Sequence, residues 1–242
     1  METAIVTGGA KRIGAALARA LAADGWHVLV HYNRSKAEAE ALAAEIGGTI
    51  VQADLEHPEA AIPIFAALNG LPPARLLVNN ASLFADDDIR SFTPERWHAH
   101  LDVNLLAPAL LARTFAEVVG AGLIVNMLDA KLASPNPDFF SYTVSKMGLA
   151  GVTELCARAF APGIRVNAIA PSVTMVSGPQ SRENFDKVHG LNALGRGVHV
   201  DDIVAALRFL IATPSVTGHT VLLDGGQRFL SLPRDVQFME PR

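Results

Sequence analysis

The chain opens with a short apolar run, residues 4–6, followed by a glycine-rich turn and then by an Ala/Leu-rich helical pattern that ends near residue 25. The turn has the spacing T-G-x-x-x-x-x-G. In a strand–turn–helix unit, glycines let backbone N–H groups approach a pyrophosphate, and the helix N-terminus adds a favourable dipole. The pattern therefore favours an α/β fold that holds a dinucleotide. An ordinary turn with close helix packing is the alternative for Gly8, Gly9 and Gly14.

Composition narrows the classes of protein that this chain can form. Half of its 242 residues are hydrophobic and the mean hydropathy is +0.27, so a large core in a single domain is expected. The net charge of −4 gives no basic excess for nucleic acid. Charges interrupt every apolar run before the roughly 18 residues of a membrane span, and no signal segment precedes the first strand. We predict a cytoplasmic protein without membrane or nucleic-acid partners, in which Cys156 is a buried structural thiol.

The second predicted strand, His27–Tyr32, is followed by a basic position. NAD-binding chains usually carry an Asp or Glu about 20 residues after the glycine motif, where it accepts from the ribose hydroxyls. Arg34 occupies that place here, and a guanidinium suits a 2′-phosphate, so we predict NADP as the cofactor. Ser35 can contribute to the same site, although Ser35 and Glu38 also form the sequence pattern of a capping box.

The next two predicted strands both end in polar residues. Asp54 lies at the end of the strand 50–55, where it can accept from an adenine amino group or cap a helix. Asn79 and Asn80 follow the apolar part of the segment 76–84. At the carboxyl end of a parallel strand, two amides can bond neighbouring backbone groups and brace the edge where ligands bind.

Further candidates follow that edge. Ser82 and Phe84 lie just beyond it, and Phe84 fits equally well in the core. Asn104 lies among apolar residues of a predicted helix and therefore needs a specific partner, although a core amide bonded to backbone is an equal alternative. His98 and His100 are two residues apart, do not share a helix face and give no metal site.

A tyrosine and a lysine near the middle of the chain are the strongest catalytic candidates. The strand 123–128 ends at Asp129, thirteen residues before Tyr142. Tyr142 and Lys146 are four residues apart and share one face of a helix. A neighbouring ammonium lowers the pKa of a phenol, which allows it to act as a general acid. For an isolated Y-x-x-x-K, a surface pair is the alternative.

Three segments are predicted without regular structure. Asp86–Asp88 is interpreted as a solvated loop. Residues 172–197 are polar and irregular, and their place after the sixth strand predicts a lid over the substrate. Val173, Met175 and Leu191 either line the pocket or form a small core of the lid. The tail, residues 231–242, lacks periodicity and is expected to cover a neighbouring subunit or to remain disordered.

Five motifs occur in an order that resembles the short-chain dehydrogenase/reductase family. They are the glycine turn, Asn79-Asn80-Ala81, Asn104, Tyr142-x-x-x-Lys146 and Asp224-Gly225-Gly226. The resemblance extends from Thr3 to about Phe229. It implies a single-domain Rossmann fold, with a seven-stranded, doubly wound parallel sheet and helices on both faces, usually assembled as a homotetramer.

Three departures from the family pattern are more specific. The family usually has Ser at Asp129, Gly at Arg12 and Gly at Ser82. These changes occur together in the pteridine reductases and dihydromonapterin reductases. The chain resembles those enzymes at Gly9–Gly14, His31–Ser35, Asn80–Phe84 and Asn126–Ala130. A fourth departure, Pro171-Ser172 in place of Pro-Gly, affects the substrate loop.

The resemblance implies a set of site residues. Those for the cofactor are Gly8, Lys11, Arg12, Ile13, His31, Tyr32, Arg34, Ser35, Asp54, Asn80, Ala81, Ser82, Tyr142, Lys146 and Pro171. Those for the substrate, a small pterin or folate, are Arg12, Ser82, Phe84, Asp129 and Tyr142, with Phe84 stacked on the pterin opposite the nicotinamide. No metal is expected.

The acid at position 129 fits this chemistry. A serine hydroxyl would donate to a ketone oxygen that becomes negative, whereas an ionised Asp129 would repel it. A carboxylate suits a substrate rich in N–H donors whose reduced bond is C=N. The hypothesis is that NADPH gives hydride to carbon while Tyr142, with Asp129, protonates nitrogen. Lys146 would hold the nicotinamide ribose, and Asn104 would hold a water that replaces the proton.

Two other functions compete with this hypothesis. The first is an NADPH-dependent carbonyl reductase of the same family, such as one acting on 3-oxoacyl thioesters, and Asp129 argues against it. The second is a catalytically weak NADP-binding sensor. The complete set of Asn104, Tyr142 and Lys146 argues against loss of catalysis.

Overall fold

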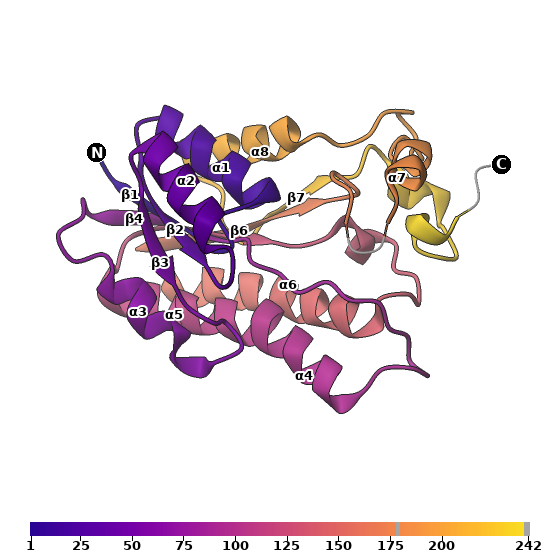
Figure 1. The fold of residues 1–242 in the computed structure, drawn as a ribbon, viewed down its shortest axis with the longest axis horizontal. Coiled ribbons are helices and arrows are strands. Elements are labelled where there is room, and N and C mark those ends of the chain that lie inside the picture. The colour runs from indigo at the N-terminus through magenta and orange to yellow at the C-terminus, as the bar shows by residue number, and fades with distance from the viewer. Residues whose placement is uncertain (178–179, 240–242) are drawn as a thin grey trace.

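The computed structural model describes residues 1–177 and 180–239. Within these residues, seven parallel strands form one sheet in the order β3-β2-β1-β4-β5-β6-β7 (Figure 1). The strands are β1 Thr3–Val6, β2 His27–Tyr32, β3 Thr49–Gln52, β4 Ala74–Asn79, β5 Gly122–Met127, β6 Ile164–Pro171 and β7 Thr220–Leu223. The helices are α1 Arg12–Ala23, α2 Lys36–Ile46, α3 Ala61–Ala66, α4 Pro94–Leu101, α5 Ala107–Val118, α6 Phe140–Phe160, α7 Arg182–Val188 and α8 Val200–Ala212. The predicted α/β Rossmann fold is confirmed.

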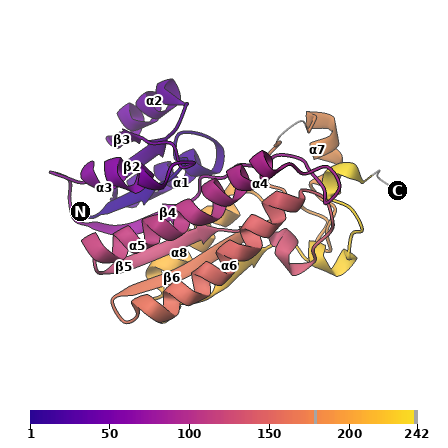
Figure 2. The same cartoon turned by 90° about the horizontal axis from the view of Figure 1, so that it is seen from below.

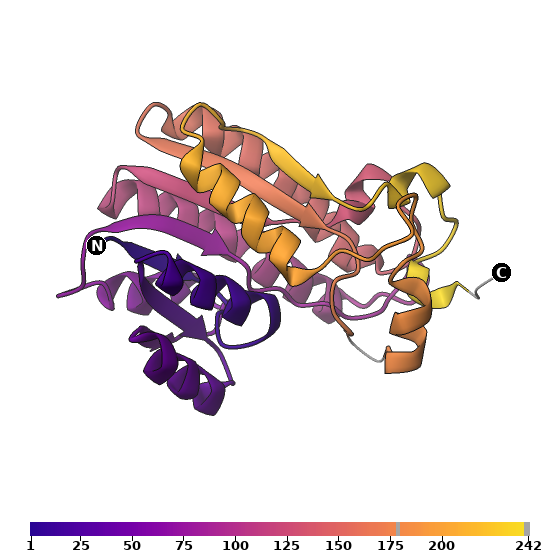
Figure 3. The ribbon, with the colours of Figure 1, turned by 90° about the horizontal axis from the view of Figure 1, so that it is seen from above.

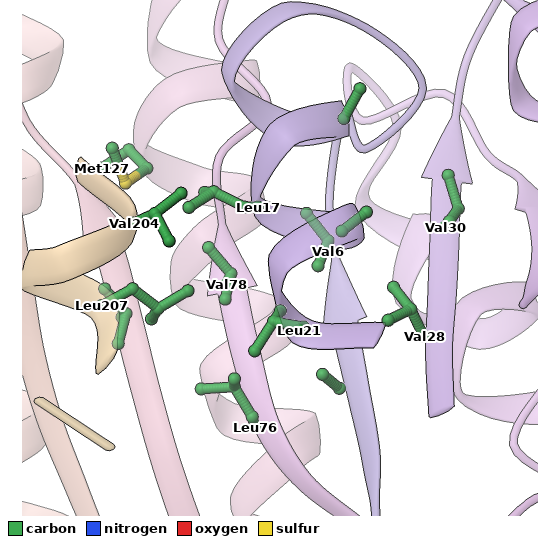
Figure 4. Close-up of a cluster of buried hydrophobic side chains, with 14 of the residues drawn as sticks. Val6, Leu17, Leu21, Val28, Val30, Leu76, Val78, Met127, Val204 and Leu207 are labelled. Atoms are coloured by element: carbon green, nitrogen blue, oxygen red, sulfur yellow. The ribbon is translucent and has the colours of Figure 1, made fainter. Parts of the chain in front are cut away.

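Helices cover both faces of the sheet. Successive residues of a strand point to opposite sides, so an apolar strand presents two apolar faces, and each of them is buried under helices. Val6 belongs to the buried cluster under α1, α2 and α8, together with Leu17 and Val204 (Figures 3 and 4). Ile5, its neighbour in β1, belongs to the second cluster, which contains Phe115 and lies under α3, α5 and α6 (Figure 2). No helix of the described residues is both long and apolar enough to cross a bilayer.

The strand order reverses between β1 and β4, and the polar edge predicted for β4 lies at this point. β1 pairs with β2 on one side and with β4 on the other. The Asn80 amide donates to the carbonyls of Thr7 and Gly8, at 2.9 and 3.2 Å. Asn79 donates to Asn126 on β5 at 2.8 Å. The prediction that these asparagines brace the carboxyl edge is confirmed, and this edge is where open α/β sheets bind ligands.

The segment predicted as an irregular lid is partly helical. α7 lies within residues 172–197, and the Ser181 hydroxyl caps it by accepting from the Asn184 amide at 3.0 Å. The prediction of an irregular segment is therefore wrong for α7. Gly178 and Pro179 lie outside the described residues.

The C-terminal tail folds onto its own chain, with a 3₁₀ turn at Val236–Phe238. The alternative that the tail is disordered is wrong for residues 231–239, whereas contact with a neighbouring subunit stays a prediction. Residues 240–242 lie outside the described ones. The tail and α7 lie side by side at one end of the molecule, next to the carboxyl ends of β6 and β7 (Figures 1 and 3). The Asn184 side chain joins them by donating to the Gln237 carbonyl at 3.1 Å.

Two local predictions also need correction. Ser35 precedes α2 but makes no side-chain capping bond, and Glu38 instead pairs with Lys11 at 2.6 Å. The segment Asp86–Asp88 is not wholly solvated. Asp87 is buried and accepts from the Ser141 amide at 3.0 Å, so it satisfies a backbone donor at the start of α6 that would otherwise lack a partner.

Gly14 tests how closely the glycine turn packs on α1. A Cβ at Gly14 would lie 2.2 Å from the Gly8 carbonyl oxygen and 2.6 Å from the Asn80 amide nitrogen. We expect Gly14→Ala to lower the free energy of unfolding by roughly 1–3 kcal/mol, because backbone must move. Gly151→Ala in α6, where a Cβ meets nothing within 4 Å, should raise it by roughly 0.5–1 kcal/mol. Urea unfolding measures both, and similar effects of the two variants would contradict the packing argument.

Candidate active site

A cavity of about 750 Å³ extends from the glycine turn to the C-terminal tail along the carboxyl edge of the sheet. Of the predicted site residues, it is lined by Gly8, Lys11, Arg12, Ile13, His31, Arg34, Asp54, Asn80, Ala81, Ser82, Phe84, Asp129, Tyr142, Lys146 and Pro171. Val173 and Met175 of the predicted lid also line it, and Leu191 does not. Residues far apart in the sequence thus meet at the point where the strand order reverses.

Three predicted residues lie outside the lining. Tyr32 packs in the core, because it alternates along β2 with His31 and points to the other side of the sheet. Ser35 follows Arg34 at the start of α2 and does not line the cavity. Asn104 is fully buried beside the cavity.

The glycine turn packs closely against the segment after β4. Gly8 has φ +59°, and a Cβ there would lie 2.9 Å from the Cα of Ala81. Arg12, the departure from the usual glycine, also has a positive φ of +54°, which is unusual for a residue with a side chain. Lys11 and Arg34 line the same end. A tight backbone cradle with three cations fits the pyrophosphate and an added phosphate of a dinucleotide.

The His31 side chain connects the glycine turn to the end of β3 by hydrogen bonds. Its Nδ1 lies 3.1 Å from the Gly8 amide and accepts that hydrogen bond, so its Nε2 donates to the Ala53 carbonyl at 3.1 Å. Burial lowers the pKa of His31 to about 4, partly opposed by the bond to Ala53 and by Asp54. The imidazole is therefore neutral, and it ties the turn to the end of β3.

Tyr142 and Asp129, both predicted as catalytic residues, are in direct contact. Tyr142, in the first turn of α6, donates its hydroxyl hydrogen to Asp129 Oδ2 at 2.7 Å. The other oxygen of Asp129 accepts from the Lys131 amide at 2.8 Å, which fixes the carboxylate after β5. The two side chains therefore meet in a fixed geometry at the cavity wall.

The pKa of Tyr142 moves in the opposite direction to the prediction. Burial raises it well above its ordinary value, and the negative charge of Asp129 raises it further. Lys146 Nζ lies 5.7 Å from the Tyr142 ring centroid, whereas the carboxylate oxygen is in hydrogen-bond contact with the hydroxyl. The prediction that Lys146 dominates this pKa is wrong for the protein alone, because the nearer charge is negative.

Lys146 is buried one helical turn after Tyr142, and its Nζ donates to the Met127 carbonyl at 2.8 Å. Burial lowers its pKa to about 8, against the opposing effect of Asp129. The predicted four-residue spacing therefore places an ammonium at the cavity wall, where it can donate to a ligand hydroxyl.

Asn104 lies in a π-helical segment, Asp102–Leu106, between α4 and α5. Its side chain exchanges two hydrogen bonds with the Leu83 backbone, at 2.8 and 2.9 Å, and donates to Ser145 at 3.0 Å. Pro108, four positions later, has no N–H to donate to the Asn104 carbonyl in the α-helical pattern. The Asn104 side chain therefore acts as a brace between the Leu83 backbone and α6.

Aromatic rings form the wall next to Tyr142. Phe84 meets the Tyr142 ring edge-on at 4.8 Å and stacks on Phe139 at 4.3 Å. Phe139 in turn stacks on Phe238 of the tail at 5.7 Å. The predicted position of Phe84 at the cavity is found in the structure, and part of its ring also packs in an aromatic cluster.

The sequence alone did not identify several lining residues. Lys131, Asp235 and Gln237 line the end of the cavity beyond Tyr142. Lys131 comes two residues after a predicted acid, which is a weak signal. Asp235 and Gln237 lie in the aperiodic tail, where no pattern indicates a site. Among the described residues, no group of three or more His, Cys, Asp or Glu side chains is arranged to hold a metal.

A doubly wound sheet, a glycine cradle where the strand order reverses and a buried Tyr–Lys pair define a dinucleotide-dependent oxidoreductase. The sequence profile of a family described as Enoyl-(Acyl carrier protein) reductase matches residues 8–228. The chain belongs to the short-chain dehydrogenase/reductase family. The predicted membership is thus confirmed.

Relatives and solved structures differ in the chemistry that they are named for. A 3-oxoacyl-[acyl-carrier-protein] reductase from Synechocystis sp. is 30% identical, with 93% of this chain and 96% of the relative covered. The structure of FolM Alternative dihydrofolate reductase 1 from Brucella suis in complex with NADP has a TM-score of 0.90 and 39% identity, covering 94% and 95% of the two chains. A blue fluorescent protein from a metagenomic library, in complex with NADPH, has a TM-score of 0.85 and 30% identity, covering 93% and 97%.

Burial of Lys146 predicts a pH-dependent stability. Between pH 8 and 10.5 the unfolded chain keeps the Lys146 proton while the folded protein has lost it, so a rise in pH favours the folded state. The free energy of unfolding of the wild type should therefore rise relative to that of Lys146→Met across this range. Urea unfolding of both proteins at several pH values measures the difference, and a constant difference would show that Lys146 keeps its ordinary pKa.

Proposed function

We propose that this enzyme uses NADPH to reduce a dihydropterin-type C=N bond to the tetrahydro form, as in dihydromonapterin, dihydrobiopterin or dihydrofolate. The observation that carries the proposal is the 2.7 Å hydrogen bond from Tyr142 to Asp129 at the cavity wall. The FolM structures, which are 39% identical, support it as solved structures of proteins named for dihydrofolate reduction. NADPH, when bound, supplies the hydride.

The carboxylate explains why the reduced bond should end in nitrogen. At a ketone, negative charge develops on oxygen, and Asp129 would stand where the family usually places a hydroxyl donor and would repel that charge. A pterin has N–H groups that donate hydrogen bonds, and a carboxylate can accept these hydrogen bonds. The Tyr142 hydroxyl, which its bond to Asp129 orients, gives its proton to the ring nitrogen and is left as a phenolate until water returns the proton. Phe84, edge-on to Tyr142, offers an apolar face for the flat ring.

The remaining groups position the cofactor and return the proton. Gly8, Lys11 and Arg12 hold the pyrophosphate, and Arg34 holds the 2′-phosphate. Lys146 donates to the nicotinamide ribose from the place where it now donates to Met127. The Asn104 backbone carbonyl binds the water that replaces the proton on Tyr142. Ser82 and Arg12 contact both pterin and cofactor phosphate.

The runner-up is a carbonyl reductase acting on 3-oxoacyl thioesters, which the relative from Synechocystis favours. Asp129 argues against it, because its carboxylate would repel the negative charge that develops on the carbonyl oxygen of a 3-oxoacyl group. A sensor without catalysis is disfavoured by the preformed contact between Tyr142 and Asp129. Homotetrameric assembly and a cytoplasmic location stay predictions.

Asp129→Ser tests the reaction. The variant should lose roughly 10²-fold or more in kcat with dihydropterin, because the proton-transfer pair is broken. NADPH affinity, measured by fluorescence titration, should stay nearly unchanged. NADPH oxidation followed by absorbance gives the rates, with an acetoacetyl thioester as the second substrate. An unchanged dihydropterin rate would remove Asp129 from the mechanism, and a wild type faster on the thioester would favour the runner-up.

Arg34→Glu tests the coenzyme. Exchanging a cation for an anion beside the 2′-phosphate should lower kcat/KM for NADPH by roughly 10²-fold. The value for NADH should fall much less, because NADH lacks that phosphate and its ribose hydroxyls can donate to the new carboxylate. Lys36→Glu, an equal charge reversal at the next exposed cation, is the control. Equal losses with both coenzymes would place Arg34 away from the 2′-phosphate.

A further inference from the structure

The C-terminal tail is fixed over the cavity by bonds to the loop before α6. The Asp138 carboxylate accepts from Arg234 Nε at 2.8 Å and from the Asp235 amide at 2.6 Å. Phe238 stacks on Phe139, with an interplanar angle of 10°. These contacts order the tail on the same chain that supplies the catalytic pair.

Asp235 is the acid that this arrangement brings to the cavity wall. Its side chain is 15% exposed and lies 3.5 Å from Lys131 Nζ, which is 7% exposed. Lys131 Nζ also donates to the Asp138 carbonyl. Asp235 Oδ1 accepts from the Gln237 amide at 3.1 Å, so the carboxylate orientation is set from two sides. Both Asp235 and Lys131 line the cavity.

The charged side chains of the cavity lining differ along its length. Near the glycine turn they are Lys11, Arg12 and Arg34, together with Asp54 and Glu56. The other charged lining residues are Asp129, Asp224 and Asp235 and the cations Lys131, Lys146 and Arg228, of which Arg228 pairs with Asp224 at 2.7 Å. Burial raises the pKa of Asp235, an effect that Lys131 opposes and that Asp129 reinforces. A substrate anion placed beside the Asp235 carboxylate, which lies 3.5 Å from Lys131, would be repelled by that carboxylate when it is ionised.

We propose that Asp235 is a specificity-determining residue, which with Lys131 binds the hydroxylated side chain of an uncharged dihydropterin and disfavours substrates whose side chain is anionic. This inference rests on the proposed function. The pair offers an acceptor and a donor, the two partners that a hydroxyl group needs. A ring that lies against Phe84, with its reduced bond at Tyr142, can direct its side chain toward the tail, because Asp235 and Gln237 of the tail line the same cavity.

The test compares two dihydropterins that differ in their side chains. Dihydrobiopterin has a short hydroxylated side chain, and dihydrofolate has an extended one that ends in carboxylates. Asp235→Asn should shift the ratio of their kcat/KM values roughly tenfold toward dihydrofolate, because one buried negative charge and one charged hydrogen bond are lost. NADPH oxidation gives both rates, and the KM for NADPH should stay unchanged.

Two matched variants separate recognition from folding. Arg234→Gln removes one anchor of the tail at a residue that does not line the cavity. It should leave the ratio of the two substrates unchanged, because the Asp235 amide still donates to Asp138 and Phe238 still stacks on Phe139. Asp201→Asn removes the same charge at an exposed position of α8 and should change neither rate. Circular dichroism and NADPH titration show that each variant is folded, and Asp235→Ala, which also loses the acceptor, should show the larger loss with dihydrobiopterin.

The outcomes are distinct. A ratio shift in Asp235→Asn that is absent from Arg234→Gln supports the inference. Equal losses on both substrates, or no change, overturn it and leave the proposed function intact. A wild type that reduces neither dihydropterin overturns the proposed function and this inference with it.

Discussion

The site depends on a phenol and a carboxylate that are held together out of water. Tyr142 is buried, and its hydroxyl is 2.7 Å from Asp129. In a medium of low dielectric constant such a bond is strong, and its geometry is costly to break. Both partners come from rigid elements, because Tyr142 lies on α6 and Asp129 directly follows β5. The remainder of the site is built to keep this contact in place.

A buried polar network under the sheet edge provides that support. Asn79 on β4 donates to Asn126 on β5, and Asn126 donates to Thr153 on α6, at 2.8 and 2.9 Å. Asn104 adds a second connection, from the loop after β4 to Ser145 on α6. Buried hydrogen bonds of this kind are costly to break, so the network limits how α6 can shift on the sheet, although Asn79 Oδ1 itself has no partner among the described residues. The position of Tyr142 is thereby fixed relative to the strands.

Much of this arrangement could be predicted from the sequence because it depends on local patterns. Strand periodicity, the glycine turn and the spacing of Tyr142 and Lys146 each reflect geometry within a single element. The direction of the Tyr142 pKa could not be predicted, since it depends on burial and on the distance to Asp129, thirteen residues earlier. The position of the tail could not be predicted from the sequence either. Asp235 is held at the cavity by a hydrogen bond to Asp138, which lies almost a hundred residues earlier in the chain.

The charge distribution explains how one scaffold can serve relatives with different substrates. The turn that holds the dinucleotide and the Tyr142–Lys146 pair belong to the part of the fold that the cofactor requires, whatever is reduced. Asp129 and residues of the tail line the same cavity, and in the proposed function they contact the substrate. A change from hydroxyl to carboxylate at Asp129 alters which atom can receive the proton while leaving β5 and α6 as they are. The similarity to a 3-oxoacyl reductase is therefore evidence about the fold. The choice of substrate has to be inferred from the side chains that line the cavity beyond Tyr142.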